Sequence, residues 1–209
     1  MCELFLPAAC ASCGRAHALG GGLCGECAAA LGPSASVALA VPRAPGTPPV
    51  LVAGVYEGAL ADVLNEYKER GRRELAPVLA GLLGRALDVL AAEVPGAVLV
   101  PVPPTRAARG RRGFDHVAAL CGPLGTTRRC LRARPRPDSV GLTAAQRRQA
   151  ARSSLAAVPR RAAALAASGR PAVLVDDIVT TGATLSAAAA VLGRAGVPVA
   201  AAVAVAAAP

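Results

Sequence analysis

Aromatic residues and long apolar runs are scarce in this sequence. Of its 209 residues, two are Tyr, two are Phe and none is Trp, although 54% are hydrophobic. A core built from this chain must therefore consist mainly of Ala, Leu and Val. So few aromatic rings also argue against recognition of nucleic-acid bases by stacking. The longest apolar run, 197–209, has 13 residues and is too short to cross a bilayer.

A secretory signal is also lacking at the start of the sequence. The first residues contain no basic segment followed by an apolar stretch, the pattern of a signal peptide. With no membrane-spanning run either, we expect a cytoplasmic protein without a membrane partner. Thiols stay reduced in that compartment, so the seven cysteines are better candidates for metal ligands than for disulfides.

Lysine is nearly absent, whereas arginine is abundant. Of the 23 basic residues only Lys68 is a lysine, and the formal net charge is +10. Fourteen arginines but only two acidic residues lie between Thr105 and Arg161. This concentration of positive charge favours an anionic ligand or partner.

Four cysteines near the start form two Cys-x-x-Cys pairs. Ten residues separate the pairs, and Gly20, Gly21 and Gly22 lie between them. Four thiolates at this spacing predict a closed, tetrahedral Zn²⁺ site, whereas the alternative is four free thiols in a flexible tail. We expect a zinc ribbon over 1–32 with four ligands: Cys10, Cys13, Cys24 and Cys27.

The stretch 173–185 is the most informative part of the chain. Val173 to Val175 is an apolar, β-branched run typical of a strand in a parallel sheet, and Asp176 and Asp177 follow it directly. A turn rich in hydroxyls comes next, and a helix is expected from Leu185 onward. Such a turn offers backbone N–H groups and the positive end of a helix to an anion. The candidate phosphate-binding residues are Val179, Thr180, Thr181, Gly182, Ala183 and Thr184.

Two adjacent carboxylates beside a phosphate site require a different partner. Asp176 and Asp177 cannot contact a phosphate directly, but they can accept hydrogen bonds from sugar hydroxyls, directly or through Mg²⁺. A sugar carrying a 5′-phosphate and free hydroxyls satisfies both halves of the motif. The alternative is an ordinary strand–turn–helix with a solvated acidic turn.

Two basic segments are candidates for a second anion contact. Lys68, Arg70 and Gly71 follow a predicted helix over 60–67, and they form either its exposed end or a loop that holds an anion. In the segment 106–116, two glycines among the arginines favour a mobile basic loop over a helix, and that loop includes Arg112. His116 could act as an acid or base, but a structural role at a helix start is favoured.

Hydrophobic periodicity predicts the remaining elements. Helical spacing extends over 75–90, apolar strands are expected at 50–56, 98–103 and 198–205, and Gly196 ends a helix. A strand near 130–132, a basic helix over 143–152 and a short strand at 37–41 are further expectations. We predict Cys121 and Cys130 to be core thiols. The expected fold is α/β, a mainly parallel twisted sheet flanked by helices, with 33–49 as a linker and 50–209 as the main domain.

The motifs together resemble one family. The stretch 173–185 is similar to the phosphoribosyl diphosphate (PRPP) motif of type I phosphoribosyltransferases. With the four-cysteine segment, 68–71, 100–114 and 142–149, the whole chain resembles the ComF family of phosphoribosyltransferase-like proteins. The resemblance implies PRPP and Mg²⁺ as ligands, with Lys68, Arg112, Asp176 and Asp177 as catalytic residues and Arg70 and Gly71 in the pyrophosphate loop.

Three functions stay open at this point. The first is transfer of phosphoribose to an unidentified base or amine with release of pyrophosphate. The second is a non-catalytic accessory protein of DNA uptake or DNA processing, which binds a phosphoribosyl ligand and contacts single-stranded DNA or a partner protein. In the third, the zinc ribbon is the functional centre and the rest of the chain is a scaffold.

Overall fold

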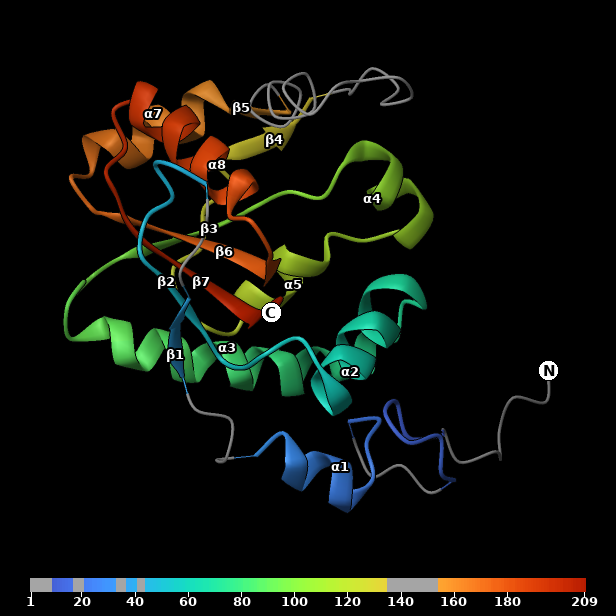
Figure 1. Ribbon diagram of the computed structural model, residues 1–209. Coiled ribbons are helices and arrows are strands. Elements are labelled where there is room, and N and C mark those ends of the chain that lie inside the picture. Colours follow the sequence, from blue (N-terminus) through green and yellow to red (C-terminus); the bar gives the residue numbers. More distant parts are fainter. Residues whose placement is uncertain (1–8, 17–20, 33–36, 41–43, 135–153) are drawn as a thin grey trace.

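A five-stranded, mostly parallel sheet forms the centre of the molecule (Figure 1). The computed structural model describes residues 9–16, 21–32, 37–40, 44–134 and 154–209. Strand order in the sheet is β1-β2-β7-β6-β3, and only β1 pairs antiparallel with its neighbour. The strands are β1 Ala38–Ala40, β2 Val50–Val52, β3 Val98–Pro101, β6 Ala172–Val179 and β7 Val199–Ala207. A separate antiparallel pair consists of β4 Leu131–Ala133 and β5 Leu155–Ala157.

Helices cover both faces of this sheet. On one face lie α2 Gly58–Glu69, α3 Ala76–Ala91 and α5 His116–Cys121, with the short 3₁₀ turn η1 Arg73–Leu75 between the first two. On the other face lie α7 Pro159–Ala167, α8 Ala183–Arg194 and the β4–β5 pair. The sequence expectation of a mainly parallel α/β sheet flanked by helices is confirmed. A parallel strand buried on both faces needs apolar residues throughout, and Val173, Leu174 and Val175 are all fully buried.

The amphipathic helices follow the predicted periodicity. In α2 the buried residues are Leu60, Val63, Leu64 and Tyr67, at the spacing that places them on one side of a helix. In α3 a similar stripe of leucines packs on the sheet, and β7 is the strand it contacts most. The predicted strands at 98–103 and 198–205 and the helix end at Gly196, where φ is +77°, are also confirmed. Cys121 and Cys130 are buried, as expected.

The expectation of a loop over 106–116 is wrong for most of the segment. Residues Arg106–Arg112 form the helix α4. Thr105 caps its start, because its Oγ1 accepts a hydrogen bond from the Ala108 N–H at 3.2 Å. Gly113 ends it in the left-handed conformation, with φ +70°, which glycine adopts without steric cost. One of the two glycines thus ends a helix rather than loosening a loop.

Other differences are smaller. β6 continues through both aspartates to Val179, where the sequence predicted its end before them, and β2 stops at Val52. The strand β5 and the helix α7 were not predicted. The predicted short strand at 37–41 and the strand near 130–132 appear as β1 and β4. The basic helix predicted over 143–152 lies outside the described residues.

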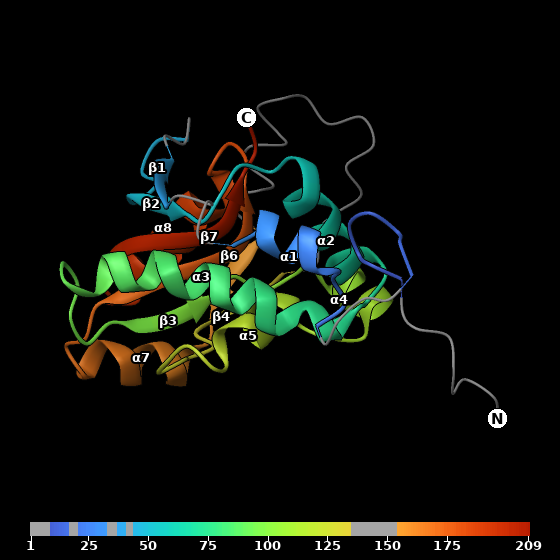
Figure 2. The ribbon, with the colours of Figure 1, turned by 90° about the horizontal axis from the view of Figure 1, so that it is seen from below.

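The four-cysteine segment packs on the helix layer that contains α2 and α3. Cys10, Ala11, Leu23 and Leu31 belong to the same buried cluster as the leucines of these helices. Figure 2 shows the short helix α1 Gly25–Ala30 beside α2. Because the segment extends the main core rather than forming a core of its own, it covers one end of the domain. Among the described helices, none is long and apolar enough to cross a membrane.

Candidate functional site

The candidate site lies where the parallel strands end. β3, β6 and β7 run in the same direction, so their carboxyl ends meet at one edge of the sheet, the usual place for a ligand in an open α/β fold. Near this edge lie the end of α2, the end of α4 and the start of α5 (Figure 1). The last residues of β6 bring Asp176 and Asp177 to the same place.

Asp177 is the centre of a buried charged cluster. Its Oδ2 lies 2.9 Å from Lys68 Nζ and 2.7 Å from His116 Nε2. Its Oδ1 accepts a hydrogen bond from the Ile178 N–H at 2.7 Å. The Asp177 and Lys68 side chains are only 8% and 18% exposed, so water screens this ion pair weakly.

The two aspartates differ in their protonation preferences. Burial acts to raise the pKa of Asp177, but the His116 hydrogen bond and the Lys68 charge outweigh it and hold the pKa well below its usual range. For Asp176, burial and the neighbouring charge of Asp177 raise the pKa well above its usual range. Asp176 is half-buried, and its Oδ1 accepts from the Asp177 N–H at 2.9 Å. Within the described residues Asp176 makes no ion pair, so its carboxyl group keeps free acceptor capacity.

A chain of contacts continues from His116 back to α2. The Arg112 guanidinium approaches His116 Nδ1 at 3.5 Å and donates to Glu69 Oε1 at 2.6 Å. The Nε2–H tautomer of His116 satisfies both ring contacts, since Nε2 then donates to Asp177 and Nδ1 accepts from Arg112. Lys68 and Glu69 are neighbours in sequence, so the contacts close a ring, which we call the polar ring: Lys68, Asp177, His116, Arg112 and Glu69.

Aromatic packing holds the ring in place from the core side. The buried Tyr67 donates its O–H to the His116 carbonyl at 2.8 Å and meets Phe114 edge to face, with 5.4 Å between ring centroids. The Arg73 guanidinium covers the Phe114 ring at 4.6 Å from its centroid. Two of the four aromatic residues of the chain are therefore used to support the start of α5, where His116 lies.

The threonine-rich turn lies directly between β6 and α8. Gly182, at the N-terminal cap of α8, has φ +77°, which an L side chain rarely adopts. Thr180, Thr181 and Thr184 are exposed, and Thr181 Oγ1 lies 3.4 Å from the Ala183 N–H. Val179 is buried, as the last residue of the strand. The first N–H groups of α8 have no acceptor within the helix, so hydroxyls and N–H donors gather at one helix start.

The segment 44–47 supports this turn, a role that the sequence did not predict. Ala44 donates its N–H to the Thr181 carbonyl at 2.9 Å, and Thr47 Oγ1 lies 3.3 Å from the Gly182 carbonyl. Ser186 Oγ donates to the Pro45 carbonyl at 2.7 Å. These contacts engage the carbonyl groups of the turn and leave its hydroxyls exposed.

The structure brings most of the predicted site residues together, but not Arg70. Lys68, Arg112 and Asp177 meet in the polar ring, and Asp176 and 179–184 continue from it along one strand–turn–helix. The Arg70 side chain is 76% exposed and pairs with Glu66, whereas Gly71, with φ +69°, turns the chain after α2. Lys68 and Glu69 are thus the last residues of a helix, as one of the two alternatives held, but Lys68 is mostly buried and does not form part of an exposed end. His116 joins the site through its contact with Asp177. In the sequence, only its position shortly after Arg112, at a predicted helix start, indicated that it could belong to the site.

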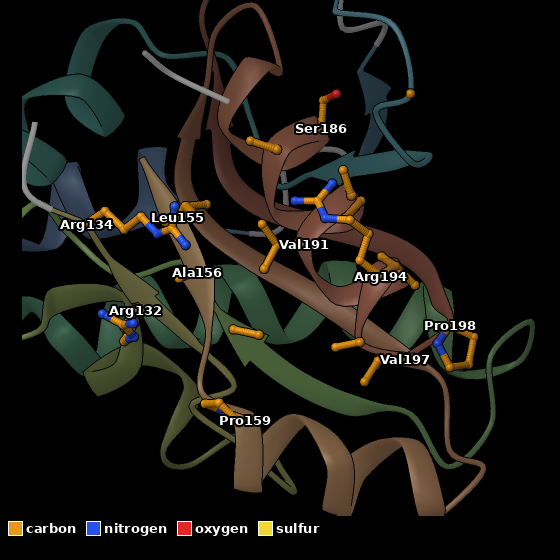
Figure 3. Close-up of a pocket in the computed structure, with 18 of the residues that line it drawn as sticks. Arg132, Arg134, Leu155, Ala156, Pro159, Ser186, Val191, Arg194, Val197 and Pro198 are labelled. Atoms are coloured by element: carbon orange, nitrogen blue, oxygen red, sulfur yellow. The ribbon is translucent and has the colours of Figure 1, made fainter. Parts of the chain in front are cut away.

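A larger concavity lies along α8, away from the polar ring. It is an open groove of about 1220 Å³ between α8 and the β4–β5 pair (Figure 3). Leu155, Ala156, Val191 and Val197 contribute apolar surface to it. Arg132, Arg134 and Arg194, all exposed, lie along it. A second, smaller cleft of about 420 Å³ lies between the four-cysteine segment and α2, and Ser12, Asp62 and Glu69 are among its lining residues.

The four predicted zinc ligands lie close to one another. The sulfur atoms of Cys10, Cys13, Cys24 and Cys27 are all within 4.8 Å of one another, and those of Cys13 and Cys24 are 3.7 Å apart. Tetrahedral zinc with Zn–S bonds of about 2.3 Å places its sulfurs about 3.8 Å apart. The cluster therefore fits a structural metal ion such as Zn²⁺.

Local backbone geometry shapes this cluster. The Gly14 N–H donates to the Cys10 carbonyl at 3.0 Å, and Gly14 takes φ +73°, which reverses the chain after the first pair. The second pair spans the start of α1, where the Ala28 N–H donates to the Cys24 carbonyl. Arg85 of α3 donates to the carbonyls of Leu31 and Gly32, at 3.3 and 2.8 Å, and ties the end of the segment to the main domain.

No family model matches the chain, and no curated protein matches it.

Proposed function

We propose that this protein is a phosphoribosyltransferase-like protein of the ComF type. It binds PRPP together with Mg²⁺ and transfers the phosphoribosyl group to a base or an amine, with release of pyrophosphate. The observation that carries the proposal is the continuous path from Asp176, through the exposed threonines, to the start of α8, next to the polar ring. The hydroxyls of the turn, the two carboxylates and the basic groups of the polar ring thus follow one another in the order of the 5′-phosphate, the ribose and the pyrophosphate in PRPP.

The threonine-rich turn is the proposed site of the 5′-phosphate. Thr180, Thr181 and Thr184 supply hydroxyl donors, and Gly182 allows close approach of the backbone. The 5′-phosphate does not react, so its binding energy serves to orient the ribose at the neighbouring carboxylates. The contacts of Ala44 and Thr47 fit this role, because they hold the turn through its carbonyl groups and leave the threonine hydroxyls exposed.

The carboxylates are the proposed partners of the ribose. Asp176 and Asp177 accept hydrogen bonds from the ribose hydroxyls, and the negative charge of Asp177 stabilises the positive charge that develops on the sugar. Asp177 has a further role here, because it also holds Lys68 and His116 in position. Asp176, with its free acceptor capacity, is the residue that would hold Mg²⁺ together with phosphate oxygens of the ligand, an oxygen donor set that this ion prefers. Bound there, the ion supplies neutralisation of the leaving pyrophosphate.

The proposed reaction is a substitution at ribose C1. The bond from C1 to the pyrophosphate oxygen breaks, and its electron pair leaves with pyrophosphate. The lone pair of the acceptor nitrogen forms the new bond to C1, and the proton of that nitrogen passes to water. Lys68 and Arg112 provide the nearby positive charge for the leaving group. Such fixed charges need no reorganisation as the bond breaks.

Calorimetric titration with PRPP and Mg²⁺ tests the proposal. We expect saturable binding to the unaltered protein and at least about a tenfold loss of affinity in Asp176→Asn, since a good charged hydrogen bond contributes about 1.5–3 kcal/mol. The matched control is Asp88→Asn, which removes the same charge from an exposed position on α3. Absence of PRPP binding to the unaltered protein, or equal loss in both variants, would refute the proposed site. Release of pyrophosphate with a panel of bases and amines then separates turnover from binding alone.

The groove along α8 favours a second candidate function, an accessory protein that contacts single-stranded DNA or an acidic partner. Three exposed arginines along an apolar floor suit a phosphate backbone, whereas the scarcity of aromatic residues disfavours base stacking. Under this proposal binding of an oligonucleotide weakens steeply with salt and falls in Arg132→Ala/Arg134→Ala. No pyrophosphate release with any acceptor, together with such binding, would favour this candidate over the transferase.

A further inference from the structure

Arg112 has an unused donor in a buried position. Its side chain is 11% exposed, and its terminal nitrogens contact Glu69 and His116. Its Nε is buried and has no hydrogen-bond partner within the described residues. A buried donor without an acceptor costs about 1–3 kcal/mol, so this guanidinium is better suited to a state in which an additional acceptor is bound.

Glu69 lies at a position where its own helix does not stabilise its negative charge. It is the last residue of α2, and a carboxylate there faces the negative end of the helix dipole, which is unfavourable. Its side chain is 55% exposed, and within the described residues its ion-pair partner is Arg112, which is 43 positions away in sequence. Glu69 therefore covers the more buried Arg112 from the solvent side.

The surroundings of Glu69 leave room for it to move. Glu69 and Arg70 line the cleft of about 420 Å³ that separates α2 from the four-cysteine segment. The cleft offers space for a glutamate side chain that leaves Arg112, and Asp62 and Glu66 also line it. Arg112, in contrast, is held from behind by His116, which Asp177 and the Tyr67 hydroxyl keep in place.

We propose that Glu69 acts as a built-in competitor for anions at Arg112. Its carboxylate accepts a hydrogen bond from Arg112 Nη2, which a phosphate group of pyrophosphate takes over when the ligand binds, and the ligand displaces the carboxylate toward the cleft. Carboxylate and phosphate are interchangeable partners for this purpose, because both accept two parallel hydrogen bonds from a guanidinium. This inference rests on the proposed function, since it assigns Arg112 to the pyrophosphate part of that site. It makes Glu69 the residue that sets the affinity for pyrophosphate and favours its release after transfer.

The opposite role for Glu69 is that of a positioning residue, which holds Arg112 in the geometry that binds the anion. The two roles predict opposite effects of Glu69→Gln, which keeps the size of the side chain and a carbonyl acceptor but removes the charge. A competitor weakens anion binding when present, so the variant binds more tightly. A positioning residue strengthens anion binding when present, so the variant binds more weakly.

Calorimetric titration of the full chain with sodium pyrophosphate and Mg²⁺ distinguishes these outcomes. We expect Glu69→Gln to bind pyrophosphate about twofold to fivefold more tightly than the unaltered protein, the size of a partly exposed ion pair. The matched control, Glu93→Gln, removes the same charge just beyond α3 and leaves affinity unchanged. In an Arg112→Met background the gain from Glu69→Gln disappears, because the competition acts through that guanidinium.

Three results would overturn the proposal: unchanged or lower affinity in Glu69→Gln, an equal gain in the Arg112→Met background, or no pyrophosphate binding to either the unaltered protein or Glu69→Gln. The first two leave the proposed function intact if PRPP still binds in a manner that depends on Asp176. Loss of PRPP binding in the unaltered protein is a failure of the proposed function itself. An unfolding curve for Glu69→Gln that matches the unaltered protein excludes a general change in the fold as the cause.

Discussion

Lys68 Nζ and His116 Nε2 contact the same oxygen of Asp177, at 2.9 and 2.7 Å. The only lysine of the chain thus shares one carboxylate oxygen with one of its two histidines. A compact ammonium group on a flexible stem leaves space for a second donor at this oxygen, whereas the planar fork of an arginine would take both oxygens. In a chain that otherwise uses arginine for positive charge, this geometry gives a physical reason for a lysine at position 68.

The two neighbouring aspartates should differ in their effect on stability. Asp177→Asn removes the charge that balances Lys68 in a poorly solvated site, and breaking a buried ion pair in this way costs about 3 kcal/mol. Asp176→Asn should change the free energy of unfolding by less than about 1 kcal/mol, because the amide still accepts from the Asp177 N–H and no ion pair among the described residues is lost. Urea unfolding of both variants measures the difference. Equal losses would contradict the assignment of Asp177 as the central charge.

Zinc should be required for the packing of the four-cysteine segment. We expect one zinc ion per chain, and its removal by a chelator should lower the thermal unfolding midpoint, since a metal bound only to the folded state stabilises that state. Cys10→Ala should lose the metal. Cys130→Ala, which removes a buried thiol elsewhere, is the control and should keep it. Zinc content can be read by metal analysis, and a zinc-free but equally stable protein would argue against a structural ion.

Alkaline pH should destabilise the fold through two buried acids. Burial raises the pKa of Cys121 from 9.0 to about 12 and also raises the pKa of Tyr67. Both groups stay neutral in the folded protein while they ionise in the unfolded chain. Their contribution is therefore fully present below about pH 9 and is lost as the pH rises toward about 12.

Urea unfolding at about pH 8 and about pH 10.5 measures this loss. Cys121→Ala removes one of the two groups, so the fall in stability between these pH values should be smaller in the variant. An identical fall would show that the Cys121 thiol does not contribute.

The Tyr67 hydroxyl should stabilise the protein more than the Tyr56 hydroxyl. Tyr67→Phe removes a second, buried donor to the His116 carbonyl, which also belongs to the helix α5, and this loss should cost about 1 kcal/mol. Tyr56→Phe is the matched control, because its hydroxyl donates to Asn65 Oδ1 in an exposed position where water replaces it. We expect that variant to lose less than about 0.5 kcal/mol in denaturant unfolding. A larger loss in Tyr56→Phe would contradict the role given to Tyr67.

Local patterns explain why much of the fold was predictable from the sequence. Helices α2 and α3 carry long apolar stripes, and β6 and β7 are apolar runs bounded by Gly or Pro, so periodicity alone identifies them. The four cysteines were recognisable because two Cys-x-x-Cys pairs are the spacing that a tetrahedral Zn²⁺ site requires. The helix α4 was not predicted, because Gly110 and Gly113 suggested a loop. The deciding features were the Thr105 cap and the left-handed Gly113, which need structural context to be distinguished from a flexible segment.

The contacts within the site were less predictable, because they join distant parts of the chain. His116 and Asp177 are 61 positions apart, and no local pattern identifies one as the partner of the other. The same holds for Glu69 with Arg112 and for Thr47 with the threonine-rich turn. The sequence identified which residue types could do chemistry, whereas their pairing depends on how α2, α4 and α5 pack at the edge of the sheet.

The position of β7 affects how the chain can fold during synthesis. β7 follows every other described strand in sequence, yet it lies between β2 and β6 in the sheet. Until residues 199–207 leave the ribosome, the β1–β2 and β3–β6 pairs have no strand to join them, and their open edges are exposed to other chains. The sheet can therefore close only as a late event. A growing chain of this protein should depend on chaperones that shield strand edges until β7 is available.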